Sequence, residues 1–284
     1  MAVRVAINGF GRIGRLAFRQ MFGAEGYEVV AINDLTSPKM LAHLLKYDSS
    51  QGKYEHADEV SASDDSITVC GKEIKIYAFP DANNCPWGEL KVDVVLECSG
   101  FYTSKEKAQA HINAGARKVV ISAPAGNDLP TIVYNTNHET LKATDTIISA
   151  ASCTTNCLAP ICKVLEDNYG IEYGLMSTIH SATAKQKVVD CRSLKDWRTG
   201  RAVFGNLIPS STGAAKAISL VIPALKDRMN GISYRVPTSD VSIVDLNVAL
   251  KTETTYEDIC KKMKKASETT LKEILDYVDD EVVS

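Results

Sequence analysis

The start of the chain carries the pattern that most limits the folds available to it. Residues 3–7 are apolar at every second position, which is typical of a strand. A helical spacing of apolar residues follows from Arg12 to Phe22, and a second apolar run, residues 29–32, leads to Asp34. Between the first strand and the helix stands a G-x-G-x-x-G motif, Gly9-Phe10-Gly11-Arg12-Ile13-Gly14. This order of elements predicts a dinucleotide-binding βαβ unit: a strand, a glycine-rich turn, a helix, a second strand and an acidic residue.

The chemistry of this motif favours NAD as the cofactor. Glycines permit a tight turn and let a pyrophosphate approach the backbone, and the N-terminus of the next helix offers N–H groups to it. A carboxylate at Asp34, 20 positions after Gly14, can accept both ribose hydroxyl groups and repels a 2′-phosphate, which selects NAD over NADP. The alternative interpretation is a packing turn followed by a surface aspartate.

The first half of the chain alternates strand-like and helical segments. Residues 92–98 and 118–122 are further apolar runs, and Thr103 and Glu106 have the spacing of a capping box that opens a helix running to about Gly115. Such alternation favours a parallel sheet with helices on its faces. We therefore predict an α/β, Rossmann-type doubly wound domain over residues 1–151.

The pattern changes after about residue 150, and a second, α+β domain is expected over residues 152–284. Strand-like runs appear at 175–180 and 241–250, and an amphipathic helix is expected from Tyr256 to Leu275. Residues 181–209 show mixed charge and little periodicity. A loop of this length in a compact domain is usually functional.

Cys153 and His180 are the candidate catalytic pair. Cys153 follows an apolar strand, residues 146–150, and precedes a helix, whose positive N-terminal end lowers the pKa of a thiol. His180 ends another predicted strand, and beside Cys153 it would act as both base and acid. The residues alone leave open a buried structural thiol and a core histidine. Cys153 and Cys157 lack the second histidine or CxxC pair of a metal site, so no metal site is predicted.

Composition excludes several classes of protein. The 284 residues suffice for two domains, and 32 basic against 35 acidic residues give a net charge of −3, without global attraction for nucleic acid or an anionic membrane. No apolar run approaches the ~18 residues of a membrane-spanning helix, and residues 1–8 lead into a strand rather than a signal peptide. The eight cysteines are scattered, unlike a disulfide framework, and fit a cytoplasmic protein.

Several motifs together resemble phosphorylating glyceraldehyde-3-phosphate dehydrogenase. The resemblance covers nearly the whole chain, and its most specific parts are SCTTN at 152–156 and STGAAKA at 211–217. The other matching segments are residues 7–15, 31–34, 157–160 and 235–238. The resemblance implies a homotetramer of glycolysis in which each subunit has an NAD domain and a catalytic domain.

The same resemblance implies roles for the candidate pair. Cys153 would be the nucleophile that attacks the aldehyde of glyceraldehyde 3-phosphate, and His180 would take the hydroxyl proton as hydride leaves for NAD. Inorganic phosphate would cleave the resulting thioester to give 1,3-bisphosphoglycerate. The backbone N–H of Cys153 and the His180 side chain would stabilise the oxyanion.

Binding residues are also implied by the resemblance. The substrate phosphate is expected at Thr183 and Arg235, and the attacking phosphate at Ser152, Thr154, Thr212 and Gly213. NAD contacts beyond the motif glycines and Phe10 are expected from Arg12, Ile13, Asp34, Ser99 and Ser122. Residues 181–209 resemble the family's S-shaped loop, which lies across a tetramer interface.

The chain also departs from the family pattern. Phe79-Pro80 stands where the family has Glu-Arg, so an arginine near the adenosine half of NAD is missing, and Cys191-Arg192 replaces Gly-Pro in the loop. The sequence ends at Ser284, where the family continues, and we expect it to be a fragment of a longer product. Two rival functions stay open: an erythrose-4-phosphate dehydrogenase, and a truncated, non-catalytic NAD-binding paralogue.

Overall fold

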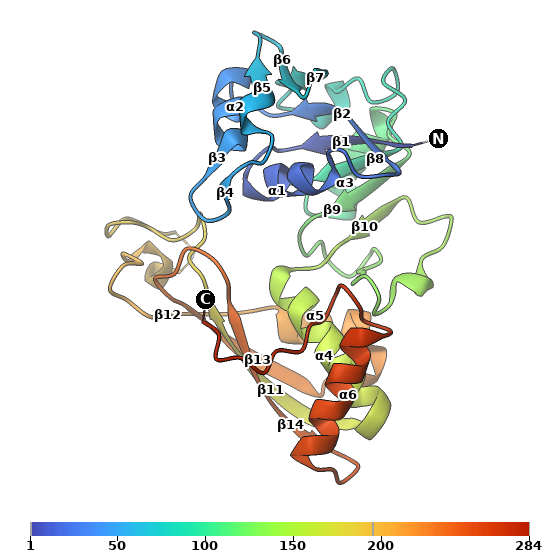
Figure 1. The fold of residues 1–284 in the computed structure, drawn as a ribbon, viewed down its shortest axis with the longest axis vertical. Coiled ribbons are helices and arrows are strands. Elements are labelled where there is room, and N and C mark those ends of the chain that lie inside the picture. The colour runs from blue at the N-terminus through green and yellow to red at the C-terminus, as the bar shows by residue number, and fades with distance from the viewer. Residues whose placement is uncertain (1, 195, 284) are drawn as a thin grey trace. The chain divides into compact units, whose positions relative to one another are not determined.

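The computed structural model describes residues 2–194 and 196–283, which form two compact units (Figure 1). The first contains the chain up to Thr131 together with Leu141–Ala151. The second contains Ile132–Thr140 and the chain from Ser152 onward. Within the described residues, no helix is both long enough and apolar enough to cross a bilayer.

The first unit is built on a sheet whose described strands run in the order β10-β9-β8-β1-β2-β7-β6-β5. The strands from β10 to β7 are parallel, and β6 and β5 extend one edge in antiparallel fashion. The chain moves outward from β1 in both directions, first through β2 and later through β8. In such sheets ligands bind at the carboxyl ends of the strands where the direction of winding reverses. The strands are β1 (Val3–Asn8), β2 (Tyr27–Asn33), β5 (Val60–Ala62), β6 (Ser66–Val69), β7 (Lys72–Tyr77), β8 (Val94–Glu97), β9 (Lys118–Ile121) and β10 (Ile147–Ser149).

Two separate apolar cores cover the faces of this sheet. Ile7 packs in one cluster with Phe18 and Leu41, whereas its strand neighbour Ala6 packs in another with Ala108. Successive side chains of a strand point to opposite faces, so α1 and α2 lie on one face and α3 on the other. The predicted doubly wound α/β fold is confirmed. The helices are α1 (Arg12–Met21), α2 (Pro38–Lys46) and α3 (Lys105–Asn113).

The second unit contains a four-stranded sheet of the described residues, in the order β12-β13-β11-β14. Strands β11 and β13 are parallel, and the two outer strands are antiparallel to their neighbours. Helices α4 and α5 pack against this sheet, and α6 packs against α4. The elements are α4 (Cys153–Tyr169), β11 (Ile171–His180), β12 (Ile208–Ser210), α5 (Ala214–Val221), β13 (Met229–Arg235), β14 (Ile243–Leu250) and α6 (Tyr256–Glu268).

Short elements complete both units. They are the hairpin strands β3 (Tyr47–Asp48) and β4 (Gly52–Lys53) and the 3-10 helices η1 (Ala57–Glu59), η2 (Ala82–Asn84), η3 (His138–Thr140), η4 (Trp197–Gly200) and η5 (Pro223–Leu225).

Two predicted helix boundaries are wrong. The capping box at Thr103 and Glu106 is not formed, because Ser104 caps α3 and accepts the N–H of Lys107 at 3.2 Å. Helix α6 ends at Glu268 rather than Leu275. Leu271 nevertheless stays buried, since its N–H bonds the carbonyl of residue 266 at 2.8 Å and a turn carries the side chain back onto the core.

The segment predicted as an irregular loop, residues 181–209, contains regular structure. Helix η4 lies within this segment. The last two residues of the segment, Ile208 and Pro209, belong to β12. Ile208 and Pro209 pair with Arg235 and Tyr234 of β13. A proline fits there because β12 is an edge strand, where one backbone N–H is not needed for the ladder.

Candidate active site

Cys153 is the first residue of α4. Ser152 caps this helix with an extended backbone, and its hydroxyl accepts the N–H of Thr155 at 3.2 Å. Ala151 adopts the left-handed conformation (φ +61°), and its N–H bonds the Ser149 hydroxyl at 3.0 Å. The thiol therefore lies in the first turn of a long, capped helix, where the helix dipole favours a negative charge.

The structure brings Cys153 and His180 together. The Sγ atom of Cys153 lies 3.2 Å from Nε2 of His180, the last residue of β11. The hydrogen bond from His180 lowers the pKa of Cys153 to about 7, against partial burial, which raises it. The same hydrogen bond raises the pKa of His180. A thiol whose pKa is lowered, beside an imidazole whose pKa is raised, is an activated nucleophile with its acid–base partner in place.

Arg235 lies on the other side of the imidazole. Residues 180 and 235 are paired in register at the ends of the parallel strands β11 and β13. Nη1 of Arg235 contacts Nδ1 of His180 at 2.5 Å and the carbonyl of Ser181 at 3.1 Å, and Nδ1 is itself 2.8 Å from that carbonyl. In the neutral ring Nδ1 accepts from the guanidinium, which can only donate; in the imidazolium Nδ1–H donates to Ser181.

The remaining predicted substrate residues all lie in the second unit. The hydroxyl of Thr154 is 4.0 Å from Cys153 Sγ. The N–H and hydroxyl of Thr183 both bond the side-chain carbonyl of Gln186, at 3.0 and 2.8 Å. Thr212 and Gly213 form the start of α5, where the Thr212 hydroxyl accepts the N–H of residue 214 at 3.2 Å. Thr154 thus lies next to the reacting sulfur, and Thr212 and Gly213 lie at a helix N-terminus.

In the first unit, two glycines of the motif are required by close backbone contacts. Gly9 has φ +90°, and a Cβ there would lie 2.5 Å from the backbone nitrogen of Ser99. A Cβ on Gly14 would lie 2.1 Å from the carbonyl oxygen of Gly9. A Cβ on Gly11, in contrast, would meet no described atom within 4 Å. Gly9 and Gly14 therefore serve the turn itself, and Gly11 leaves open space at the helix N-terminus.

Asp34 joins the end of β2 to the glycine-rich turn. Its carboxylate accepts the N–H of Phe10 at 2.7 Å and the N–H of Thr36 at 2.9 Å. Asp34, Gly9, Gly11 and Ser99 line one cavity of about 510 Å³. The structure thus gathers these predicted NAD residues around a single space that lies at the carboxyl ends of β1, β2 and β8.

Three other predicted NAD residues have different surroundings. The Arg12 guanidinium bonds both carboxylate oxygens of Asp48, at 2.7 and 2.8 Å. Ile13 is 54% exposed on α1. The N–H of Ser122 bonds the carbonyl of residue 97 at 3.0 Å. None of the three is among the residues that line the cavity.

The unusual pair Phe79-Pro80 forms part of the same cavity wall. The Phe79 ring stacks on Tyr77 with centroids 6.0 Å apart. Phe101, which follows β8, also lines the cavity. This chain therefore has an apolar, aromatic wall where the family pattern suggests an arginine.

Four polar residues in or next to the lining of this cavity are not predicted from the sequence. Asn8, Asn33, Glu97 and His111 form a continuous hydrogen-bonded cluster. A weak signal was available, because Glu97 ends an apolar strand and a buried carboxylate needs partners.

One mixed group of described side chains could share a cation. Ligand atoms of His56, Glu59 and Cys70 lie within 4.8 Å of one another. The imidazole of His56 faces the carboxylate of Glu59 at 3.9 Å and that of Glu55 at 3.8 Å. All are partly or fully exposed, and charge pairing at the surface accounts for the arrangement.

Apolar side chains are exposed on the sheet of the second unit. On the face opposite His180, Tyr173 and Leu175 of β11, Ile232 of β13 and Ile243 of β14 point outward. We call these four residues the outer sheet face.

The 181–209 segment exposes further large apolar side chains, including Val188, Leu194 and Trp197. Two of its arginines pair locally: Arg201 with Asp190 at 3.0 Å, and Arg198 with Asp196 at 3.3 Å.

Comparison with known proteins gives consistent matches along the chain. Residues 3–105 match the family described as glyceraldehyde 3-phosphate dehydrogenase, NAD binding domain, and residues 152–284 match its C-terminal domain. The glyceraldehyde-3-phosphate dehydrogenases of Clostridium pasteurianum and Clostridium acetobutylicum are each 55% identical over 282 residues, which is 99% of this chain and 83% of theirs. That of Chlamydia pneumoniae is 53% identical over 284 residues, covering 99% of this chain and 84% of its own.

Proposed function

This chain belongs to the glyceraldehyde-3-phosphate dehydrogenase family, and we propose that it oxidises D-glyceraldehyde 3-phosphate to 1,3-bisphosphoglycerate with NAD and inorganic phosphate. The observation that carries this proposal is the approach of Cys153 Sγ to His180 Nε2 at 3.2 Å, with a thiol pKa of about 7. That pair supplies both the nucleophile and the proton acceptor that the reaction requires.

The cavity of the first unit fits NAD. It is lined by Gly9 and Gly11 of the glycine-rich turn, where the backbone can approach a pyrophosphate, and by Asp34, whose carboxylate suits a ribose diol. Phe79 and Phe101 offer apolar walls to a planar base. Bound NAD supplies the hydride acceptor of the reaction.

Cys153 begins the reaction. Its thiolate forms a bond to the aldehyde carbon, and the carbonyl oxygen takes a proton from the His180 imidazolium to give a hemithioacetal. The backbone N–H of Cys153 and Nε2–H of His180 stabilise the negative oxygen on the way. His180 then removes the hydroxyl proton as the C–H electron pair departs, which leaves a thioester on Cys153.

Phosphate completes the reaction. An oxygen of inorganic phosphate bonds to the thioester carbon, the C–S bond breaks, and the sulfur leaves as the thiolate that the helix N-terminus and His180 stabilise. We assign Ser152, Thr154, Thr212 and Gly213 to this phosphate, because hydroxyls and helix N-terminal N–H groups are good phosphate donors.

Arg235 and Thr183 are assigned to the phosphate of the substrate. Nη1 of Arg235 already contacts His180 and Ser181, but a guanidinium has five N–H donors, so its fork has others for a phosphate oxygen. One side chain would thus connect the recognition of the phosphate to the base.

We further propose that the protein works in the cytoplasm, in glycolysis, as a homotetramer. The outer sheet face and the 181–209 segment support the assembly, because both expose large apolar side chains and exposed apolar patches mark protein interfaces. In a tetramer these surfaces would be covered by other subunits.

The test is NADH formation from purified protein with glyceraldehyde 3-phosphate, with and without inorganic phosphate, and with erythrose 4-phosphate as the rival aldehyde. The proposal predicts a phosphate-dependent steady rate that is higher with glyceraldehyde 3-phosphate. A rate independent of phosphate rejects phosphorolysis, and a higher rate with erythrose 4-phosphate assigns the other substrate.

Two variants separate the chemistry from cofactor binding. Cys153→Ser should abolish turnover and leave NAD binding intact, whereas His180→Asn should slow thioester formation by about 10²–10⁴-fold, the usual effect of losing an acid–base group. Full turnover by Cys153→Ser would refute the assignment of the nucleophile.

A further inference from the structure

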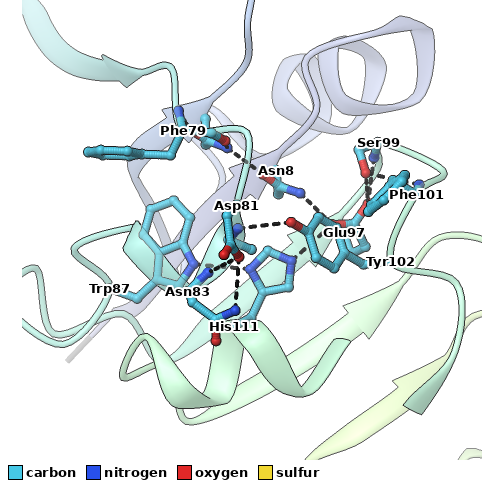
Figure 2. Close-up of polar contacts among 12 residues, drawn as sticks. Asn8, Phe79, Asp81, Asn83, Trp87, Glu97, Ser99, Phe101, Tyr102 and His111 are labelled. Carbon is cyan, nitrogen blue, oxygen red and sulfur yellow. Dashed lines mark hydrogen bonds and ion pairs between the residues drawn. The ribbon is translucent and has the colours of Figure 1, made fainter. Parts of the chain in front are cut away.

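Glu97 and His111 form a buried hydrogen-bonded pair in the first unit, in contact with residues that line the cavity (Figure 2). Glu97 ends β8, and His111 lies in the last turn of α3. Both side chains are 0% exposed, and Nε2 of His111 is 3.0 Å from Oε2 of Glu97. A carboxylate removed from water in this way must be held by donors or it would be strongly destabilising.

The neighbours of this pair determine where its protons are. Nε1–H of Trp87 is 3.1 Å from Nδ1 of His111, and an indole can only donate. Nδ1 therefore accepts, and the proton of the neutral imidazole is on Nε2, from which it is donated to Glu97. Burial raises the pKa of Glu97, but the hydrogen bonds from His111, Ser99 and Asn8 outweigh it, so its net pKa is lowered.

Each oxygen of the Glu97 carboxylate accepts hydrogen bonds from a different residue of the cavity wall. Oε1 accepts both the N–H of Ser99, at 2.7 Å, and the Ser99 hydroxyl. Oε2 accepts the side-chain amide of Asn8 in addition to His111. Ser99, which follows β8, and Asn8, which ends β1, both line the cavity.

Further hydrogen bonds connect Asn8 through Asn33 to Phe79. The side-chain carbonyl of Asn8 accepts from the side-chain amide of Asn33 at 2.8 Å. Asn33 then bonds both backbone groups of Phe79, accepting its N–H at 2.8 Å and donating to its carbonyl at 3.0 Å. This backbone clamp holds Phe79 in the wall of the cavity. A single buried carboxylate thus connects two walls of the cavity.

We propose that the Glu97–His111 pair is the positioning element of the cofactor site, which fixes Ser99 on one side and the Asn8–Asn33–Phe79 chain on the other. Neither Glu97 nor His111 is among the residues that line the cavity, so both act through the residues they hold. The inference rests on the proposed binding of NAD. If the inference is correct, the pair determines the affinity for NAD and leaves the properties of the second unit unchanged.

The test compares two substitutions of His111. His111→Gln keeps one acceptor for Trp87 and one donor for Glu97, whereas His111→Leu keeps neither. We expect His111→Leu to weaken NAD binding by about tenfold or more, the scale of a lost buried hydrogen bond to a charge. His111→Gln should bind NAD with an affinity close to that of the wild-type protein. The KM for the aldehyde, measured at saturating NAD, should stay within about twofold of wild type.

A matched control removes a polar contact elsewhere. Tyr169→Phe deletes the 2.7 Å bond from the Tyr169 hydroxyl to Asp258 in the second unit, and should lower thermal stability without changing the Kd for NAD. If His111→Leu does not fold, Trp87→Phe removes the donor to Nδ1, together with some buried volume, and should weaken NAD binding in the same direction.

The outcomes separate this inference from the proposed function. Wild-type protein that binds no NAD by calorimetry contradicts the proposed function. Wild-type protein that binds NAD, with folded His111→Leu or Trp87→Phe binding it as tightly as Tyr169→Phe, overturns the positioning role. Weakened binding that His111→Gln does not restore also overturns it, because the hydrogen bonds would then not be the cause.

Discussion

The sulfur of Cys153 and Nε2 of His180 lie 3.2 Å apart, where the first turn of α4 meets the end of β11. Each group changes the protonation of the other. The hydrogen bond lowers the pKa of Cys153 to about 7 and raises the pKa of His180. The protonation of each group therefore depends on that of the other.

Alkylation should report this pair directly. Because the thiolate is the reactive form, the rate at which iodoacetate modifies Cys153 should rise through an inflection near pH 7 and then level off. In His180→Asn the hydrogen bond is lost, so the inflection should move toward the ordinary thiol value of about 8.5. Mass spectrometry of the Cys153 peptide measures both profiles. An inflection near 8.5 in wild-type protein would contradict the pairing.

Replacing Arg235 should alter both substrate binding and the base. The guanidinium lowers the pKa of His180 through its positive charge, so Arg235→Ala should raise that pKa and move the acid limb of the pH–rate profile to higher pH. The KM for glyceraldehyde 3-phosphate should increase by about tenfold or more, as for a lost charge-assisted hydrogen bond. Unphosphorylated glyceraldehyde provides the comparison: an equal loss with both aldehydes would argue against a role in phosphate recognition.

Two glycines of the motif should respond differently to the same substitution. Gly14→Ala places a Cβ 2.1 Å from the Gly9 carbonyl, so it should destabilise the fold by about 3 kcal/mol. Gly11→Ala meets no described atom within 4 Å, so stability should change by about 1 kcal/mol or less. Its NAD affinity should still fall by about tenfold, because the methyl group occupies space that the pyrophosphate needs. Denaturation curves and NAD titrations of both variants test this contrast.

The carboxylate of Asp34 should set the preference between NAD and NADP. Asp34→Asn removes the charge that repels a 2′-phosphate, so the ratio of kcat/KM for NADP to that for NAD should rise by about tenfold. The amide nitrogen of asparagine cannot accept, so the hydrogen bond from the N–H of either Phe10 or Thr36 is lost and thermal stability should fall. An unchanged cofactor ratio would indicate that the ribose is recognised elsewhere.

Local chemistry explains which parts of the molecule are predictable. The glycine-rich turn, Asp34 at the end of β2 and Cys153 at the start of α4 depend on a few neighbouring residues, and the sequence pattern places all three correctly. The doubly wound sheet follows from the spacing of apolar runs. The end of α6 cannot be predicted in this way, because the apolar periodicity continues through a turn to Leu271 while the helix stops at Glu268.

Contacts between distant segments could not be derived from pattern alone. His180 and Arg235 meet because β11 and β13 pair in register, and nothing near either residue specifies that register. Glu97 and His111 each look ordinary in their own segment, one at the end of an apolar strand and one in a helix. Their connection becomes apparent only in the folded structure, where the two side chains form a hydrogen bond.

The last prediction concerns assembly. Leu175 of β11 and Ile243 of β14 are each 58% exposed on the outer sheet face, although both lie in regular strands. If subunits associate through this face, Leu175→Lys should break the assembly, because a buried charge without a partner opposes association. Glu172→Lys, an exposed substitution on the same strand, is the matched control. Light scattering at several concentrations should show smaller species for Leu175→Lys alone. A tetramer that survives Leu175→Lys and Ile243→Lys together would place the subunit contacts on another surface.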